Sequence, residues 1–212
     1  MRDKPLVIIG GGGHACVVAE AAVLSGWTII GHIAPEAGSD PLLGVWLGDD
    51  EKLIEIVDKH ISLAIGIGFV TSRGAQIRAG IMSQIPVDCL ATITHPNATV
   101  SPSSRVDQGV FVAAGAIIGT GARLDVGVLV NSAAVVEHHC HIGRNSHVAT
   151  GAHITGAVTT GCDVLIGAGA VVRQGLSIGD SAVIGAGSVL LKNATVGTVW
   201  IGHPARQIEL ET

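Results

Sequence analysis

Aliphatic side chains recur at every sixth residue through the second half of the chain. From Val100 to Val196 in steps of six, every position is Val, Ile or Leu except Thr160. A second series, four residues after each member of the first, holds mostly small side chains such as Ala116 and Ala134. A period of six is typical of short strands joined by tight turns, with two side chains per hexad pointing inward.

Three such strands close a triangular coil, and stacked coils bury the aliphatic columns along their axis. Glycine often follows the aliphatic position, where we expect it to permit the dihedral angles of the bend. With 48% hydrophobic but only 2% aromatic residues, the chain suits a thin, regular core. The repeat therefore predicts a β-solenoid of between five and six coils of about 18 residues.

The first half alternates strand and helix patterns. A strand from Leu6 runs into glycines and a helix over 15–25, and a second strand follows over 27–33. We expect strands near 44–48 and 62–67, helices over 49–57 and 71–83, and a last segment over 87–91. This order predicts a parallel sheet with crossover helices, and thus an α/β domain over 1–91 followed by the β-helix over 92–212.

The loop Gly10-Gly-Gly-Gly13 lies between the first strand and the first helix. Such a loop lets backbone N–H groups approach a phosphate at the helix N-terminus, although glycine turns also occur without a ligand. No G-x-x-x-x-G-K-[ST] motif is present, which argues against an ATP-hydrolysing P-loop. The second strand does not end in an acidic residue, which argues against a dinucleotide-binding dehydrogenase.

Charge and cysteine content exclude several classes of partner. The formal net charge is −5, which argues against nucleic acid or an anionic membrane as the partner. Apolar stretches are broken every few residues by Gly, Ser, Thr, Asn or His, so no membrane span is expected. The four cysteines are scattered, and the first apolar run is interpreted as a strand rather than a secretion signal. We therefore expect reduced thiols and a cytoplasmic protein.

Together the two halves resemble one bacterial family. The features are the Gly-Gly-Gly-Gly-His opening, Ala-Ile-Gly-Ile-Gly at 64–68, the hexads, the stretch 131–147 and the ending Gly-His-Pro-Ala-Arg at 202–206. They are similar to hexapeptide-repeat sugar acetyltransferases, which include nucleotide-sugar N-acetyltransferases and sialic-acid O-acetyltransferases. The resemblance implies a left-handed parallel β-helix, a homotrimer, and acetyl-CoA bound between neighbouring helices. Outward apolar residues Ile117, Leu129 and Val135 also favour contacts between subunits.

The resemblance implies that the chain is an acetyl-CoA-dependent sugar N-acetyltransferase. It would acetylate the amino group of a nucleotide-linked amino-dideoxy sugar in cell-surface polysaccharide synthesis. O-acetylation of sialic acid or a related nonulosonic acid is the alternative, and a scaffold without catalysis is the third hypothesis. His138 matches the family's general base, and acetyl transfer needs no acyl-enzyme because the thioester is already activated. The family carries a carboxylate after this base, where the chain has His139. Either Glu137 takes over that role, or His139 is a neutral hydrogen-bond acceptor, or the base is weak.

The remaining site residues follow from the resemblance alone. It implies Gly12, Gly13, His14 and Gly66 for the nucleotide diphosphate, Asn131 for the sugar, and His147, Gly156, Ala168 and Ala186 for acetyl-CoA. Ala34 and Pro35 fall where relatives contact the base with acidic residues, so the nucleotide stays open. No metal is expected: His141, His147 and His153 share one hexad phase and must face three different sides of a coil.

Overall fold

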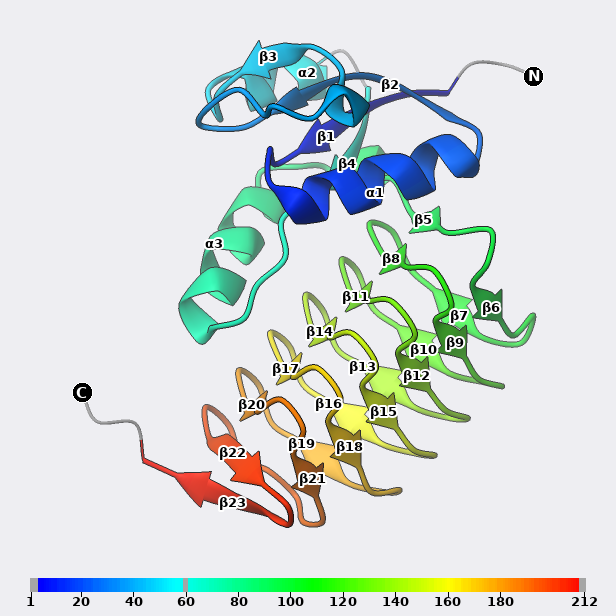
Figure 1. The fold of residues 1–212 in the computed structure, drawn as a ribbon, viewed down its shortest axis with the longest axis vertical. Helices are drawn as coiled ribbons and strands as arrows, with labels where there is room; N and C mark the ends of the chain where they lie inside the picture. The colour runs from blue at the N-terminus through cyan, green and yellow to red at the C-terminus, as the bar shows by residue number, and fades with distance from the viewer. Residues whose placement is uncertain (1–3, 59–60, 210–212) are drawn as a thin grey trace.

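A computed structural model describes residues 4–58 and 61–209. It has a small α/β unit seated on one face of a long coil of short parallel strands (Figure 1). None of the helices within these two ranges is long and apolar enough to cross a membrane.

The α/β unit has a four-stranded parallel sheet in the order β3-β2-β1-β4. Leu6 and Ile8 pack against α1, whereas Val7 and Ile9 pack on the opposite face against α2 and residues near the end of α3. The strand and helix order predicted from the sequence is confirmed. The elements are β1 (Lys4–Ile9), α1 (Gly13–Leu24), β2 (Trp27–Ile33), η1 (Pro41–Leu43), β3 (Trp46–Gly48), α2 (Lys52–Asp58), β4 (Ser62–Ile65), α3 (Ser72–Met82) and η2 (Val87–Cys89).

The rest of the chain is the predicted parallel β-helix, which is left-handed. Three sheets form its faces, and we name each by one strand: the β8 sheet, the β9 sheet and the β10 sheet. The β8 sheet holds β5 (Ile93–Thr94), β8 (Phe111–Val112), β11 (Leu129–Val130), β14 (His147–Val148), β17 (Leu165–Ile166), β20 (Val183–Ile184), β22 (Val199–Gly202) and β23 (Ala205–Ile208). The β9 sheet holds β6 (Thr99–Val100), β9 (Ile117–Ile118), β12 (Val135–Val136), β15 (His153–Ile154), β18 (Val171–Val172) and β21 (Val189–Leu190). The β10 sheet holds β7 (Arg105–Val106), β10 (Arg123–Leu124), β13 (His141–Ile142), β16 (Thr159–Thr160) and β19 (Ser177–Ile178).

The inward columns predicted from the hexads are confirmed. Strands one coil apart pair in parallel at a register of 18 residues, as in Leu129 opposite His147. Every sixth residue from Val112 to Leu190 is buried. The column ends before Val196, which is 68% exposed, because the antiparallel hairpin β22–β23 closes this end of the helix instead.

Thr160 breaks the aliphatic column for a reason that the structure explains. Its side chain is buried, and its Oγ1 accepts a hydrogen bond from the Gly143 backbone N–H at 3.0 Å. In neighbouring coils the equivalent N–H is bonded to a backbone carbonyl, as Gly119 N–H is to Val136 O. In this coil the Thr160 hydroxyl therefore takes the place of that backbone carbonyl as the acceptor for a buried N–H.

The glycines that follow the aliphatic positions serve close approach rather than a special dihedral angle. Gly119, Gly167 and Gly179 lack a positive φ, but a Cβ at each would lie within 2.7 Å of backbone atoms of the next coil. The positive φ falls elsewhere in the turn, for example at Gly127 and His139. The prediction that glycines after the aliphatic positions permit special dihedral angles is therefore wrong, because these glycines instead permit close contact between coils.

The three faces of the helix carry different outward side chains. On the β8 sheet, Phe111 and Leu129 pack against α1 and the underside of the small sheet. The expectation that Leu129 contacts another subunit is wrong, because the α/β unit of the same chain covers it completely. Ile117 and Val171 on the β9 sheet are 43% and 36% exposed. The β10 sheet presents polar side chains, including Arg123.

Candidate active site

The glycine loop leads into the N-terminus of α1. Gly12 is the N-cap residue, has no side chain to cap the helix, and is exposed together with Gly13. A Cβ at either position would meet nothing within 4 Å, and within the described ranges no backbone acceptor is seen for the N–H of Gly12 or Gly13. Uncapped N–H groups and the helix dipole make this end of α1 suited to an anionic group.

A cavity of about 350 Å³ adjoins this loop. Its lining is Gly11, Gly12, Ala34, Pro35, Glu36 and Ala37, so it joins the glycine loop to the residues that follow β2. Glu36 brings a carboxylate into this wall. The cavity lies at the carboxyl ends of β1 and β2, where parallel sheets commonly bind ligands.

The segment 66–69, which follows β4, lies behind the glycine loop. A Cβ at Gly66 would overlap Ala15 of α1, and a Cβ at Gly10 would overlap the Gly66 carbonyl. Gly68 lies against the ring of His14. Burial lowers the pKa of His14 to about 4, with His147 and Arg78 adding to the effect, so this imidazole is neutral near pH 7.

His138 lies in the turn from the β9 sheet to the β10 sheet, which we call the second corner. Its Nδ1 lies 3.1 Å from His139 Nδ1, and the two rings meet edge to face. The Glu137 carboxylate accepts a hydrogen bond from the His138 backbone N–H instead of its ring. A Cβ at Gly156, one coil further, would overlap the His138 imidazole. His139 itself adopts a left-handed conformation, with φ of 57°.

Asn131, Ala168 and Ala186 lie in turns from the β8 sheet to the β9 sheet, which we call the first corner. The Asn131 side chain accepts a hydrogen bond from the Ser132 N–H at 2.8 Å. In the part of the chain that the structure covers, no partner is seen for the backbone N–H of Ala168 or Ala186. A largely apolar cavity of about 250 Å³ runs beside them. It is lined by Val70, Ala149, Leu165, Gly167, Ala168, Val183, Ile184, Gly185 and Ala186.

His147 lies on the β8 sheet beside Leu165, next to this cavity. Its Nδ1 donates to the Phe69 carbonyl at 2.8 Å, because a carbonyl can only accept. Burial lowers the pKa of His147 to about 4, so Nε2 is a bare acceptor, and it lacks a partner among residues 4–58 and 61–209.

The predicted site residues therefore fall into two groups within one chain. Gly12, Gly13, His14 and Gly66 gather at the α/β unit over the β8 sheet, near His147 and the first corner. Glu137, His138, His139 and Gly156 gather at the second corner, which is the corner of the triangle opposite the β8 sheet. Asn131 lies in the same coil as His138, but at a different corner.

Two further features bear on the choice of site. His141, His147 and His153 lie on three different sheets, as the hexad phase predicted, and His141 contacts Asp125. Within the described ranges, no group of three His, Cys, Asp or Glu side chains gathers to hold a metal ion.

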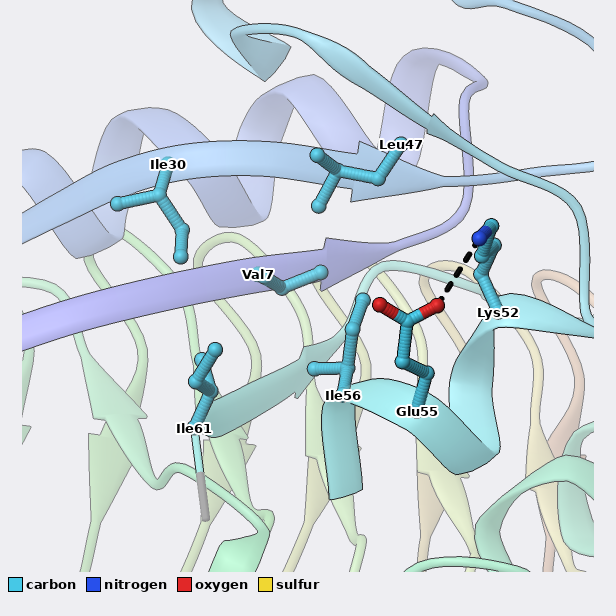
Figure 2. A pocket seen from close by; sticks show the side chains of 7 residues that line it. All are labelled: Val7, Ile30, Leu47, Lys52, Glu55, Ile56 and Ile61. Carbon is cyan, nitrogen blue, oxygen red and sulfur yellow. Dashed lines mark hydrogen bonds and ion pairs between the residues drawn. The ribbon is translucent and has the colours of Figure 1, made fainter. Parts of the chain in front are cut away.

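A third cavity, of about 190 Å³, lies on the outer face of the small sheet and is lined mainly by aliphatic side chains. Figure 2 shows Val7, Ile30 and Ile61 lining it, with the ion pair of Lys52 and Glu55 at one side. It lies on the sheet face opposite α1 and away from the glycine loop. We interpret it as incomplete coverage of the sheet by the short helix α2.

Sequence reasoning missed Arg78 and Phe69, which join the two units. Arg78 is fully buried on α3, on the same helix face as Ala75 and Met82. The sequence does contain a signal for Arg78: it follows the helical spacing of the apolar residues Ala75 and Met82, at a position that is normally apolar.

Comparisons with known proteins cover both halves of the chain. A family model described as the PglD N-terminal domain matches residues 5–83, and one described as bacterial transferase hexapeptide matches residues 157–192. No curated protein sequence matches significantly.

Solved structures match along nearly the whole length. The acetyltransferase domain of PglB from Neisseria gonorrhoeae, in complex with acetyl coenzyme A, is 30% identical, with a TM-score of 0.88 over 97% of this chain and 100% of that chain. PerB from Caulobacter crescentus, in complex with CoA and GDP-perosamine, is 33% identical, with a TM-score of 0.84 over 97% of each chain. WeeI from Acinetobacter baumannii, 17% identical with a TM-score of 0.57 over 96% of this chain and 99% of that chain, shares the fold.

Proposed function

Because the chain belongs to the hexapeptide-repeat sugar acetyltransferases that carry a PglD-type N-terminal domain, we propose that it acetylates a nucleotide-linked amino-dideoxy sugar. Acetyl-CoA is the donor, and the sugar amino group is the acceptor. One observation carries the proposal: the chain is similar over 97% of its length to a protein solved with CoA and GDP-perosamine together. The similarity therefore covers both the α/β unit and the β-helix, the two parts in which we place the nucleotide-sugar and acetyl-CoA sites.

The open glycine loop is the proposed site of the nucleotide diphosphate. The exposed N–H groups of Gly12 and Gly13 at the end of α1 favour the diphosphate charge. The adjoining cavity of about 350 Å³ accommodates the nucleoside, with Glu36 as a hydrogen-bond acceptor for the base. His14, neutral because its pKa is lowered to about 4, packs behind the loop against Gly68 and Phe111.

The apolar groove at the first corner is the proposed site of the acetyl-CoA pantetheine arm. The N–H groups of Ala168 and Ala186 lie one coil apart, about 4.8 Å, and donate to amide carbonyls of an extended arm. His147 lies beside the groove and holds the neighbouring segment through its hydrogen bond to the Phe69 carbonyl. The apolar lining suits the methylene groups between these amides.

His138 is the proposed general base. The sugar amine attacks the thioester carbonyl carbon, its proton passes to His138 Nε2, and the C–S bond breaks to release CoA, which takes up a proton as a thiol. The contact between His138 Nδ1 and His139 Nδ1 supports this role. When His138 donates from Nδ1 to His139, its Nε2 keeps the lone pair that the reaction needs.

A homotrimer completes this site. The first and second corners flank the β9 sheet, so one chain holds His138 and the acetyl-CoA groove at opposite edges of that sheet. A threefold ring of parallel helices joins the second corner of one subunit to the first corner of the next. The exposed Ile117 and Val171 on the β9 sheet favour burial in this interface.

We assign this reaction to the cytoplasm, in cell-surface polysaccharide synthesis. The four cysteines are unpaired, which suits a reducing compartment.

An acetyl-transfer assay with a substrate panel tests the proposal. GDP-, UDP- and dTDP-linked 4-amino sugars and free sialic acid are each offered with acetyl-CoA, and CoA thiol release and product mass are measured. We expect turnover with at least one nucleotide-linked amino sugar. Turnover with sialic acid alone would instead support O-acetylation, and no turnover despite binding of acetyl-CoA would support a scaffold.

A further inference from the structure

Arg78 is the charged side chain that is fully buried in the described part of the chain. It projects from α3 into the turns from the β10 sheet to the β8 sheet, which we call the third corner. Its Nη1 donates to the Gly127 carbonyl at 2.7 Å and to Asn145 Oδ1. Burial lowers the pKa of Arg78 to about 10, so the guanidinium stays charged near pH 7.

A side chain of the third corner also donates hydrogen bonds, one of them back to α3. Asn145 Nδ2 donates to the Ala75 carbonyl of α3 at 3.0 Å and to Asp163 Oδ1 at 2.6 Å. Asn145 and Asp163 both have left-handed backbones, with φ of 57° and 59°, in two successive coils. Two neighbouring coils are thus fastened to α3 by a guanidinium and an amide, and neither side chain is free to shift alone.

The other end of the guanidinium reaches the segment behind the glycine loop. Arg78 Nε donates to the Ile67 carbonyl at 2.8 Å. Ile67 lies between Gly66, which packs on Gly10 and Ala15, and Gly68, which packs on His14. The residue that Arg78 holds, Ile67, is thus flanked by the two glycines that pack against the glycine loop and the start of α1. Through this hydrogen bond the guanidinium connects the loop to the coils of the β-helix.

We propose that Arg78 is a positioning residue: it sets the height of the glycine loop on the β-helix, and so aligns the nucleotide sugar with the acetyl-CoA groove. The proposal rests on the proposed function for its substrates. A side chain with one donor centre cannot bond Ile67 O, Gly127 O and Asn145 Oδ1 at once in this fork geometry.

Arg78→Lys and Arg78→Met test this role, with Arg73→Lys and Arg73→Met as controls. Arg73 lies on the same helix but is exposed. In Arg78→Lys we expect the KM for the nucleotide sugar to rise at least about tenfold, and to rise by a larger factor than the KM for acetyl-CoA. Arg78→Met should show a larger rise, and both Arg73 variants should show none. A purely structural role would lower kcat with the folded fraction and leave both KM values unchanged, and that outcome rejects the proposal.

Amide hydrogen exchange gives a second readout that does not depend on activity. In Arg78→Lys, peptides covering 10–16 and 63–71 should exchange faster than in Arg73→Lys, while peptides covering 189–208, at the far end of the β-helix, should not change. Unaltered exchange at 10–16 and 63–71 would overturn the role of Arg78, as would an Arg78→Lys chain that does not fold. If the wild-type protein shows no acetyl transfer, the proposed function is rejected. The hydrogen-exchange comparison would still test whether Arg78 holds the glycine loop in place.

Discussion

At the scale of single residues, the second corner is built around one imidazole. His138 is exposed, and the inward column beneath it is filled by Val136 and Ile142 rather than by His138 itself. Gly156 leaves the space that the ring occupies, and His139 supplies a nitrogen at 3.1 Å. A substitution of His138 should therefore change catalysis without disturbing the buried core of the β-helix.

His138→Asn should keep the fold and the acetyl-CoA affinity while kcat falls at least about 10²-fold, because the general base is lost. Gly156→Ala should lower kcat in the same direction, since the new methyl group displaces the ring. Steady-state kinetics and circular dichroism check both variants. Wild-type turnover in His138→Asn would place the base elsewhere.

His139→Glu should move the acidic limb of the kcat/KM profile to higher pH than in the wild-type enzyme. A protonated His138 cannot accept the amine proton, and a carboxylate in place of His139 stabilises the imidazolium. The pH profiles of the two enzymes are compared under identical salt. A limb at the same pH in both enzymes would mean that residue 139 does not act on the catalytic imidazole.

At the scale of the coil, two kinds of glycine do different work. Gly179 has an ordinary φ, but its Cβ would lie 2.5 Å from the Val196 backbone N. Gly175 has φ of 70°, and its Cβ would meet nothing within 4 Å. The first kind permits coils to stack closely, whereas the second kind permits the turn itself.

Gly179→Ala should therefore destabilise the protein by about 3 kcal/mol or more, because backbone must move to relieve the overlap. Gly175→Ala should cost only about 1 kcal/mol, the strain of a left-handed alanine. Urea denaturation followed by circular dichroism gives both values. Equal losses in the two variants would contradict the distinction between close approach and dihedral freedom.

The coil is also the scale at which the sequence is most informative. The hexads specify which residues point inward, and the α/β pattern specifies the small sheet, because both follow from local periodicity. The prediction that Leu129 contacts another subunit is wrong, although Phe111, Leu129 and Leu165 recur at multiples of 18 residues and are all buried outward positions. Contacts such as Arg78 with Gly127 and Asn145 depend on how two units dock, and no local pattern encodes them.

The same limit applies to the candidate site. Residues 137–139 are neighbours in sequence, so their proximity was predictable, although only the structure shows that His139 rather than Glu137 faces the His138 ring. The pairing of Phe69 with His147 joins segments 78 residues apart and needed the docked structure.

At the scale of the whole molecule, the exposed apolar face of the β9 sheet is the feature that calls for a partner. We expect Val171→Arg to weaken the proposed trimer and to lower acetyl-CoA affinity, because the substitution would bury a charge in the proposed interface. Ser177→Arg, on the next sheet of the same coil and exposed, is the matched control. Light scattering and calorimetry measure the two effects. A wild-type protein that is monomeric at micromolar concentration would contradict the trimer itself.

Docking of the two units should also make stability depend on pH. The pKa of His147 is about 4 in the folded protein, lower than the ordinary value of about 6.5, so the unfolded chain binds more protons between these values. The free energy of unfolding should therefore fall by about 1.4 kcal/mol per pH unit for this group as the pH drops from 6.5 towards 4. His147→Gln should show a shallower slope in this interval, and His153→Gln, which is exposed, should keep the wild-type slope. Chemical denaturation across this range checks the prediction, and parallel slopes in wild type and His147→Gln would refute it.

The register of 18 residues has a consequence for changes in chain length. An insertion of six residues in a turn would rotate everything downstream by one face, and the side chains that now meet α3 would point to solvent. An insertion of 18 residues would leave every downstream side chain on its own face and move it about 4.8 Å along the axis. Between β21 and β22, which lie beyond the strand that carries Val183, such a shift only lengthens the prism. Between β11 and β14 it would pull His147 away from Phe69. The molecule can therefore grow in whole coils, and only beyond the point where the α/β unit holds it.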